Sequence, residues 1–488
     1  MKLRDVLAAL DPRRAGNLFK GPDELTLTEG GIGWPLFYLS LPIVITNLLQ
    51  TAYNLADTFW LGQYSTDALT AITFGFPMVF LLISMGMGLS VAGSVLVAQY
   101  TGAGSEDEAE YAASQTVTFA VVASLVLGAG GYLLVEDLLG LLGADGRILG
   151  LAASYMEVVS LGLVFMFGFF VFISLMRGYG DTVTPMLVML GTVVLNIALD
   201  PFLIFGWGPF PELGITGAAI ATVFSRGLAM IVGLGIMFRG TRGVKINPRD
   251  MVPDLMYLRR LVRIGLPASV EGMGRALSVN ILIGIVATFP DAVVAAFGVG
   301  IRVFSVIFLP AIAVGRGVET ITGQNVGAGN EDRAARTNDF AAVAMFAVLS
   351  VAAVVVWFTA SDIVALFTDD PAVIPVGAEF LRTVAPTFGF MGVMRAYSGG
   401  FRGTGRTLTA AAIAIFTQGV VRLPLAWVGA SQFGTQGLFA AFIVSNITGA
   451  VVALIWFRRG TWRDADLTDD PTTPVAESVV EDEPAIDD

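Results

Sequence analysis

The sequence predicts an all-α integral membrane protein: twelve transmembrane helices in two pseudo-symmetric six-helix bundles, related as parallel repeats around a central cleft. Three observations predict this fold: an apolar composition, apolar runs of spanning length, and an internal repeat. Of 488 residues, 55% are hydrophobic and 14% are charged. A soluble chain of this size could not bury so much apolar surface, so most helices are expected to face lipid.

Apolar runs divide the chain into twelve helices, separated by Gly, Pro and charge clusters. Each run is long enough to cross a hydrocarbon core of ~30 Å. The expected spans are 35–62, 70–98, 112–136, 149–176, 184–207, 214–238, 258–288, 293–317, 338–360, 373–399, 407–430 and 436–457. They predict a cytoplasmic N-terminal segment (1–34), an N-terminal lobe (35–240), a cytoplasmic linker (241–257), a C-terminal lobe (258–460) and an acidic disordered tail (461–488).

Basic residues lie almost entirely on one side of this arrangement. Twenty Lys and Arg residues lie in the termini and around the even-numbered connections, against one, Arg147, in the odd-numbered connections. The positive-inside rule therefore predicts a multi-pass protein of the cell membrane with both termini in the cytoplasm. The tail 464–488 contains ten acidic residues and no basic residue, so it accounts for most of the net charge of −12. Such a composition is typical of a solvated, disordered segment.

Missing residue types exclude several kinds of chemistry. The chain has no Cys and no His, which excludes thiolate metal sites, haem ligation by His and His-based triads. Its three Lys residues lie outside any phosphate-loop motif. We therefore expect no enzyme, no bound cofactor and no nucleic-acid partner. The scarcity of Lys, the acidic balance and the absence of Cys are typical of a halophile, and we expect an origin in a halophilic archaeon.

An internal repeat relates the two halves at an offset of 225 residues. Gln99 corresponds to Gln324, Gly102-Ala-Gly104 to Gly327-Ala-Gly329, and Arg177-Gly to Arg402-Gly. Matches at one constant offset indicate duplication. Because each half has six helices, both halves enter and leave on the same side, so the repeats are parallel and related by an axis along the membrane normal. Two such bundles predict a transporter that rocks around a central cleft.

Two acids interrupt the first repeat at membrane depth but not the second. Asp57 aligns with Leu282, and Asp200 aligns with Leu425. A carboxylate inside the bilayer costs at least about 2.5–3.5 kcal/mol on insertion scales, and structure alone does not require one there. Two carboxylates that converge in a poorly solvated bundle need a proton or another positive charge between them. We therefore expect this pair to bind the coupling ion, H⁺ or Na⁺.

Helical spacing places polar partners beside both acids. Gln50, Tyr53 and Asp57 fall on one face of the first helix, and Asn196 and Asp200 are four residues apart on the fifth. Pro201 cannot donate a backbone hydrogen bond, which frees a carbonyl one turn earlier. Oxygen ligands of this kind suit a hard cation such as Na⁺. Pro42 and Pro201 are the positions at which we expect helices to bend.

Five segments together resemble the multidrug and toxic compound extrusion (MATE) family, and most closely its DinF-like branch. They are Leu41–Pro42, Asn54-Leu-Ala-Asp57-Thr58, Gln99-Tyr-Thr-Gly-Ala-Gly104, Arg177-Gly-Tyr-Gly-Asp-Thr182 and Asn196-Ile-Ala-Leu-Asp200-Pro201. The resemblance covers about 35–457. It implies that Asp57, Asn196, Asp200 and Thr222 couple the cation and that they would form the site if the cation is Na⁺. It also implies a monomeric antiporter that exports amphiphilic, often cationic drug-like molecules.

The remaining expectations concern the cavity and the second lobe. We expect Gln50, Tyr53, Asn54, Tyr155 and Met189 to line the substrate cavity. Glu271 lies four residues before Arg275, a spacing that favours a structural salt bridge. Several arginines embedded in the second-half helices keep one alternative open, a lipid-linked oligosaccharide flippase of the same superfamily. The sequence identifies neither the natural substrate nor the coupling ion.

Overall fold

The computed structural model describes residues 19–20, 25–463 and 467–468, and all regular structure in this part of the chain is helical. Most of the predicted N-terminal segment and of the acidic tail lie outside the described residues. The chain thus forms an all-α, multi-pass architecture. No β-strand is formed within the described ranges, as expected where lipid cannot satisfy backbone hydrogen bonds.

The helices follow the apolar runs to within a few residues. Their bounds are α2 Gly33–Tyr64, α3 Thr66–Ala103, α4 Glu106–Leu133, α5 Val135–Leu141, α6 Gly146–Leu161, α7 Leu163–Tyr179, α8 Val183–Phe205, α9 Ile215–Arg239, η3 Pro248–Met251, α10 Leu255–Val286, α11 Asp291–Ile307, α12 Leu309–Gly327, α13 Glu331–Ala365, α14 Val373–Val384, η4 Ala385–Thr387, α15 Phe388–Gly403, α16 Thr407–Ile415, η5 Phe416–Arg422 and α17 Leu423–Arg458.

The number of spans depends on how broken helices are counted. Eight helices in the described chain are long and apolar enough to cross a membrane, or up to ten if each bent pair forms one span. One bent pair, α6 and α7, meets at Gly162 with an angle of 55°. The other, α11 and α12, meets at Phe308 with an angle of 40°, and Pro310 lies at the start of α12. Helix breaks thus account for two of the differences from the predicted twelve.

Two further breaks explain the rest of the difference. The stretch Thr407–Arg458 is continuous by hydrogen bonding, but Gly434 has φ 60° and ψ −140°, which is not helical. Gly434 lies between the predicted spans 407–430 and 436–457. The predicted span 373–399 is divided into α14 and α15 by the short 3₁₀ turn η4, which contains Pro386. A proline lacks the backbone donor that would continue the helix.

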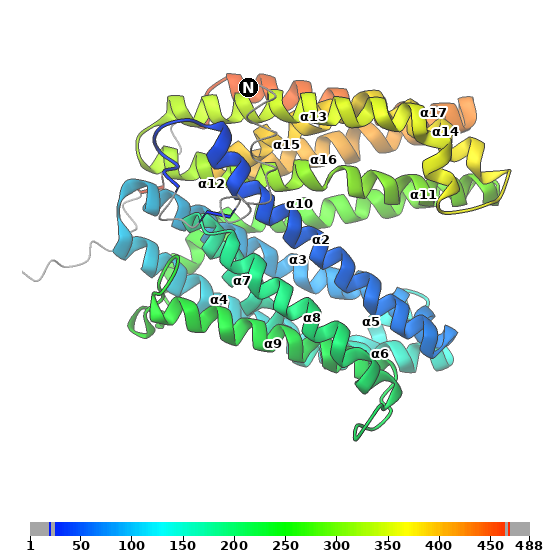
Figure 1. Cartoon of the computed structure of the whole chain (residues 1–488), viewed down its shortest axis with the longest axis horizontal. Coiled ribbons are helices and arrows are strands. Elements are labelled where there is room, and N and C mark those ends of the chain that lie inside the picture. Colours follow the sequence, from blue (N-terminus) through cyan, green and yellow to red (C-terminus); the bar gives the residue numbers. More distant parts are fainter. Residues whose placement is uncertain (1–18, 21–24, 464–466, 469–488) are drawn as a thin grey trace, which may run out of the picture.

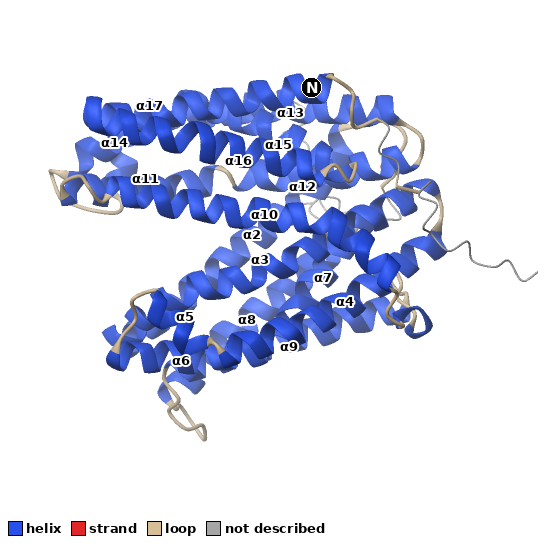
Figure 2. Ribbon diagram, turned by 180° about the vertical axis from the view of Figure 1, so that it is seen from behind, coloured by secondary structure: helices blue, strands red, loops and turns tan. Residues whose placement is uncertain are grey.

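The helices form two groups that meet at one end of the molecule and diverge toward the other. We call α2–α9 the N-terminal lobe and α10–α17 the C-terminal lobe. The lobes diverge toward the end that carries α5, α6, α11 and α14 (Figures 1 and 2). Along the line where they meet, α3 packs against α10 and α12, and α2 packs against α12. We call the closed end the basic-loop end, because it carries the connection 240–254.

A pair of glutamines joins the lobes symmetrically at the basic-loop end. Gln99 of α3 donates from Nε2 to the Gly403 carbonyl of the opposite lobe at 3.1 Å. Gln324 of α12 donates to the carbonyls of Gly178 and Tyr179 at 3.1 and 3.0 Å. Gln99 and Gly178 correspond to Gln324 and Gly403 under the 225-residue offset. The duplicated residues therefore make equivalent contacts across the interface.

Close backbone approach beside these glutamines explains the repeated Gly-Ala-Gly turns. A Cβ on Gly102 would lie 1.9 Å from the Gln324 carbonyl oxygen. A Cβ on Gly327 would lie 1.9 Å from the Gln99 carbonyl oxygen. No side chain fits at either position, so these glycines allow the two helix ends to touch.

Candidate ion-coupling site

Three helices of the N-terminal lobe bring the predicted coupling residues together. Asp57 lies on α2, Asn196 and Asp200 on α8, and Thr222 on α9. All four side chains are buried, and α8 packs against both α2 and α9. The i, i+4 spacing of Asn196 and Asp200 places both on the same face of α8. The site therefore lies inside the lobe and away from its lipid-facing surface.

The two carboxyl groups are neighbours. The Asp57 side chain lies next to those of Asp200 and Thr222. Asn196 donates from Nδ2 to Asp200 Oδ1 at 3.2 Å. Two acids that share one buried environment cannot both remain charged unless a cation or a proton compensates them. The structure thus brings together the two acids that the sequence predicted to share a positive charge.

Several buried oxygen atoms at this site lie close to one another but lack a hydrogen bond of good geometry among the described residues. They are Tyr53 Oη, Asp57 Oδ1, Asn196 Oδ1, Asp200 Oδ2 and Thr222 Oγ1. Unpaired buried polar atoms are uncommon in folded proteins, and a cluster of them indicates a missing partner. Carboxylate, amide and hydroxyl oxygens suit a hard monovalent cation, and a carboxylate also suits a proton. The donor set therefore fits Na⁺ or H⁺ as transported ions.

Arg226 belongs to this site, although the sequence analysis did not include it. Its guanidinium donates to Gln50 Oε1 at 2.7 Å and to Met189 Sδ at 3.4 Å. It stacks over the ring of Tyr53 at 4.7 Å and lies near Asp57. A sequence signal existed, since Arg226 lies one helical turn after Thr222. Arg226 gives the acid pair a fixed, buried positive neighbour.

The expected cavity residues lie in two environments. Tyr53, Tyr155 and Met189 are buried, and Tyr155 lies near Asp57 and packs against Gly75. Asn54 is exposed and accepts a hydrogen bond from Gln50 at 2.9 Å. The structure therefore gathers Gln50, Tyr53, Tyr155 and Met189 around the acid pair, and Asn54 extends this face of α2 by one turn to an exposed position.

The two expected bending positions lie within unbroken helices. Pro42 lies inside α2, and Pro201 lies inside α8. The Thr46 hydroxyl donates to the Pro42 carbonyl at 2.8 Å. Bending at Pro42 and Pro201 stays a prediction about movement.

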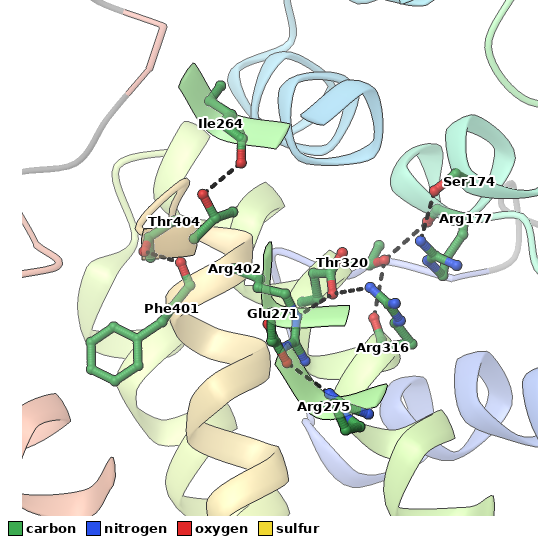
Figure 3. A network of polar contacts seen from close by, with 12 residues as sticks. Ser174, Arg177, Ile264, Glu271, Arg275, Arg316, Thr320, Phe401, Arg402 and Thr404 are labelled. Carbon is green, nitrogen blue, oxygen red and sulfur yellow. Dashed lines mark hydrogen bonds and ion pairs between the residues drawn. The ribbon is translucent and has the colours of Figure 1, made fainter. Parts of the chain in front are cut away.

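The equivalent positions of the C-terminal lobe carry no acids. Leu282 is buried in the hydrophobic core, and Leu425 is largely exposed. Charge gathers elsewhere in this lobe. The predicted pair Glu271–Arg275 is confirmed at 2.8 Å, and Arg402 bonds to both Glu271 and Glu319, at 3.2 and 3.1 Å (Figure 3).

A family model for MatE matches the chain twice, over residues 42–202 and 267–428. The two matches begin 225 residues apart, which is the offset of the internal repeat. They cover most of the described helices and both halves of the molecule.

Curated relatives match over almost their full length. The chain is 28% identical over 440 residues to the "Probable multidrug resistance protein YpnP" of Bacillus subtilis, covering 89% of this chain and 97% of that protein. It is 29% identical over 427 residues to a "FAD transporter" of Shewanella oneidensis, covering 87% and 94%.

Solved structures share the fold. One is described as "Outward-facing conformation of a multidrug resistance MATE family transporter of the MOP superfamily", with a TM-score of 0.84, 24% identity and coverage of 90% and 98%. Another, from Pyrococcus furiosus, is described with the words "Reverse polarity of binding pocket suggests different function", with a TM-score of 0.83 and 24% identity. The chain therefore belongs to the MatE family of secondary active multidrug efflux transporters, and it is a membrane transporter rather than an enzyme.

Proposed function

We propose that this chain exports amphiphilic, often cationic organic compounds in exchange for H⁺ or Na⁺ bound between Asp57 and Asp200. The observation that supports this most strongly is the pair of neighbouring buried carboxyl groups with unpaired oxygens around them. A cation bound there would compensate their charge. Asn196 Oδ1 and Thr222 Oγ1 are the additional oxygens that would face it.

Antiport follows from competition for this negative charge. A cationic cargo beside Tyr53 and Gln50 and a coupling ion at the acid pair each weaken the binding of the other, because both are attracted by the same carboxylates. Such reciprocity is required by thermodynamic linkage. Arg226 strengthens the competition, since its fixed charge limits how much further positive charge the site accepts. Binding of the ion therefore promotes release of the cargo.

The same proposal includes the membrane arrangement. We place twelve spans across the bilayer, by counting each of the bent pairs α6–α7 and α11–α12 as one span, counting α14–α15 as one, and dividing Thr407–Arg458 at Gly434. The two lobes, 35–240 and 258–460, rock about the basic-loop end in a monomer, and both termini and the linker 241–257 lie in the cytoplasm. With this orientation the lobes diverge toward the outside (Figure 2), which corresponds to an outward-facing state. The positive-inside distribution of Lys and Arg supports this orientation.

The finer identity of the transporter rests on composition and motifs. We assign the chain to the DinF-like branch, because its membrane-depth acids lie in the first lobe. We assign an origin in a halophilic archaeon, because the chain has three Lys, no Cys and a net charge of −12. The names of the relatives include both multidrug resistance and FAD transport, so the cargo is defined here only as an amphiphilic organic compound.

Transport with separately imposed gradients tests the proposal. The purified chain in liposomes is given a pH gradient or a Na⁺ gradient, and uptake of the fluorescent cation ethidium is measured. We expect accumulation under at least one gradient and none without a gradient. Ethidium movement that ignores both gradients would contradict antiport. Gradient-independent movement of a lipid-linked oligosaccharide would instead support the flippase alternative.

A further inference from the structure

A cluster of charged residues, most of them in the C-terminal lobe, combines buried acids with partly exposed arginines and has no role in the coupling mechanism. We call it the arginine cluster, and it consists of Arg177, Arg275, Arg316, Arg395 and Arg402 with Glu271 and Glu319. Four of its arginines lie on α10, α12 and α15, and the fifth, Arg177, lies in the last turn of α7 in the opposite lobe. Figure 3 shows Arg177 of α7 next to Thr320 and Arg316 of α12. The cluster therefore lies where the lobes meet.

Positive charge exceeds negative charge in this cluster. Glu271 bonds to Arg275 at 2.8 Å and to Arg402 at 3.2 Å, and Glu319 bonds to Arg316 at 2.9 Å and to Arg402 at 3.1 Å. Five guanidiniums thus face two carboxylates. Other ion pairs of the described chain, such as Arg147–Asp67 and Arg458–Asp339, match one base with one acid. A purely structural network would be expected to balance its charges in the same way.

Some donors of the cluster have no acceptor. The side chain of Arg395 makes no hydrogen bond or ion pair with a described residue, although it lies near Arg275 and Glu271. The Nε atoms of Arg177 and Arg275 are buried and lack a partner in the described part of the chain. Unpaired guanidinium donors deep in a membrane protein are costly unless an anion meets them.

The cluster is also accessible. The side chain of Arg275 is 35% exposed and that of Arg316 is 23% exposed, whereas those of Glu271 and Glu319 are 7% and 2% exposed. The acids are thus covered, whereas part of the Arg275 and Arg316 side chains is exposed. Arginine forks bind carboxylates and phosphates through paired hydrogen bonds.

We propose that the arginine cluster binds the anionic group, a phosphate or a carboxylate, of an amphiphilic molecule. This site goes beyond the proposed function and does not depend on the acid pair of the N-terminal lobe. The guanidiniums of Arg275, Arg316 and Arg395 would hold the anion from the C-terminal lobe. Arg177 would approach it from the other lobe. Because Arg177 moves with the N-terminal lobe, rocking changes the number of guanidiniums around the anion, and with it the affinity.

Direct contact across the interface links the cluster to this movement. The Thr320 hydroxyl donates to the main-chain oxygen of Arg177 at 3.1 Å, and Arg177 Nη2 donates to Ser174 Oγ at 2.8 Å. Arg177 is therefore held in the cluster only while the basic-loop end is closed. A ligand with different affinity for the two states shifts the equilibrium between them.

Equilibrium binding to the full-length protein in nanodiscs tests this site. The probes are flavin mononucleotide and riboflavin, which share a fluorescent ring and differ by one phosphate. We expect flavin mononucleotide to bind at least tenfold more tightly in a low-chloride buffer. Arg395→Gln removes a guanidinium without breaking a hydrogen bond or ion pair between described residues and should abolish the difference. Arg275→Gln should do the same. The matched control Arg302→Gln, at an exposed position on α11, should retain it.

The lipid composition of the nanodiscs distinguishes two sources of the anion. If phosphatidylglycerol discs weaken flavin mononucleotide binding relative to phosphatidylcholine discs, and Arg395→Gln removes that competition, the site accepts a lipid headgroup. If both lipids give equal binding, it accepts a soluble anionic cargo. Equal affinities of the wild type for the two flavins, or an unchanged preference in Arg395→Gln, would overturn the proposal. Since no ion gradient is used, Asp57→Asn should retain the preference even where transport fails.

Discussion

The two lobes share their contacts with each other but differ in the charges they bury. Gln99 and Gln324 make equivalent bonds across the interface, and Gly102 and Gly327 allow equivalent backbone approach. The interiors differ. The N-terminal lobe buries two neighbouring acids with one arginine, whereas the C-terminal lobe buries more arginines than acids. The two halves thus share their contacts at the basic-loop end, which we call the hinge, whereas their interiors have diverged.

The repeat offset shows how far the interiors diverged. Within the arginine cluster, Arg177 and Arg402 correspond to each other under the 225-residue offset. No other member has an identical counterpart. The other members align with uncharged residues: Glu271 with Thr46, Arg275 with Gln50, Arg316 with Val91, Glu319 with Ser94 and Arg395 with Phe170. The acids of the N-terminal lobe align with leucines. Each lobe thus carries charges that the other lacks, an acid pair in the N-terminal lobe and a cluster with excess arginine in the C-terminal lobe.

The largest effect is expected at the acid pair of the N-terminal lobe, which has no counterpart in the C-terminal lobe. Asp57→Asn and Asp200→Asn each remove one charge of the acid pair, so the coupling ion loses its binding site. We expect gradient-driven ethidium uptake to fall to background, about 100-fold, with normal amounts of protein in the membrane. The control Asp67→Asn removes an exposed acid paired with Arg147 and should retain transport. Full transport by either acid variant would remove the pair from the mechanism.

The second largest effect is expected on the stability of the C-terminal lobe, where the ion pairs of Arg402 hold buried carboxylates. Arg402→Gln leaves the buried carboxylates of Glu271 and Glu319 with fewer partners. We expect the free energy of unfolding to fall by about 3–5 kcal/mol, because breaking a buried pair leaves uncompensated charge. Thermal unfolding of the detergent-solubilised protein measures this. Arg395→Gln is the matched control, and its unfolding temperature should change much less. Equal losses in both variants would contradict the assigned ion pairs.

Much of the fold was predictable because lipid imposes simple rules. Helices that face the bilayer must be apolar for their full length, so hydropathy located each span near its observed bounds. The expected spans 149–176 and 293–317 were single runs, yet each is broken into two helices in the structure. Apolar content does not report the angle between consecutive segments. Gly162 and Pro310 were visible in the sequence, but neither alone determines a bend.

The site was predictable in part for the same reason. Asp57 and Asp200 were identified because a carboxylate at membrane depth is costly, and the structure places them side by side. Arg226 was not, because the sequence does not specify which helix a long side chain will reach. Its bond to Gln50 joins residues 176 positions apart. The arginine cluster was missed similarly, since only its i, i+4 and i, i+3 pairs are local in sequence.

A smaller effect tests the shared hinge. Gly102→Ala and Gly327→Ala each place a methyl group against a carbonyl of the opposite lobe. We expect both to favour the state open at the basic-loop end by about 1–3 kcal/mol. Since the chain has no native Cys, labelling of a single Thr320→Cys reporter measures opening. Gly130→Ala is the control, because nothing lies within 4 Å of its Cβ. An effect of only one glycine would mean that the hinge is not symmetric.

The smallest effect separates the two coupling ions within the N-terminal lobe. Thr222→Val replaces a hydroxyl that lacks a hydrogen bond of good geometry among the described residues with a methyl group of similar size. If that hydroxyl is merely buried, its removal is neutral or stabilising, because an unpaired polar group is lost. If it faces Na⁺, Na⁺-driven uptake should fall by about fivefold while H⁺-driven uptake is unchanged, since a proton on a carboxyl needs no hydroxyl ligand. Thr192→Val is the matched control, because the Thr192 hydroxyl already bonds to its own helix at 2.8 Å. Unchanged uptake under both gradients would show that the hydroxyl is merely buried, and equal losses under both would show that it supports the acid pair and not Na⁺ alone.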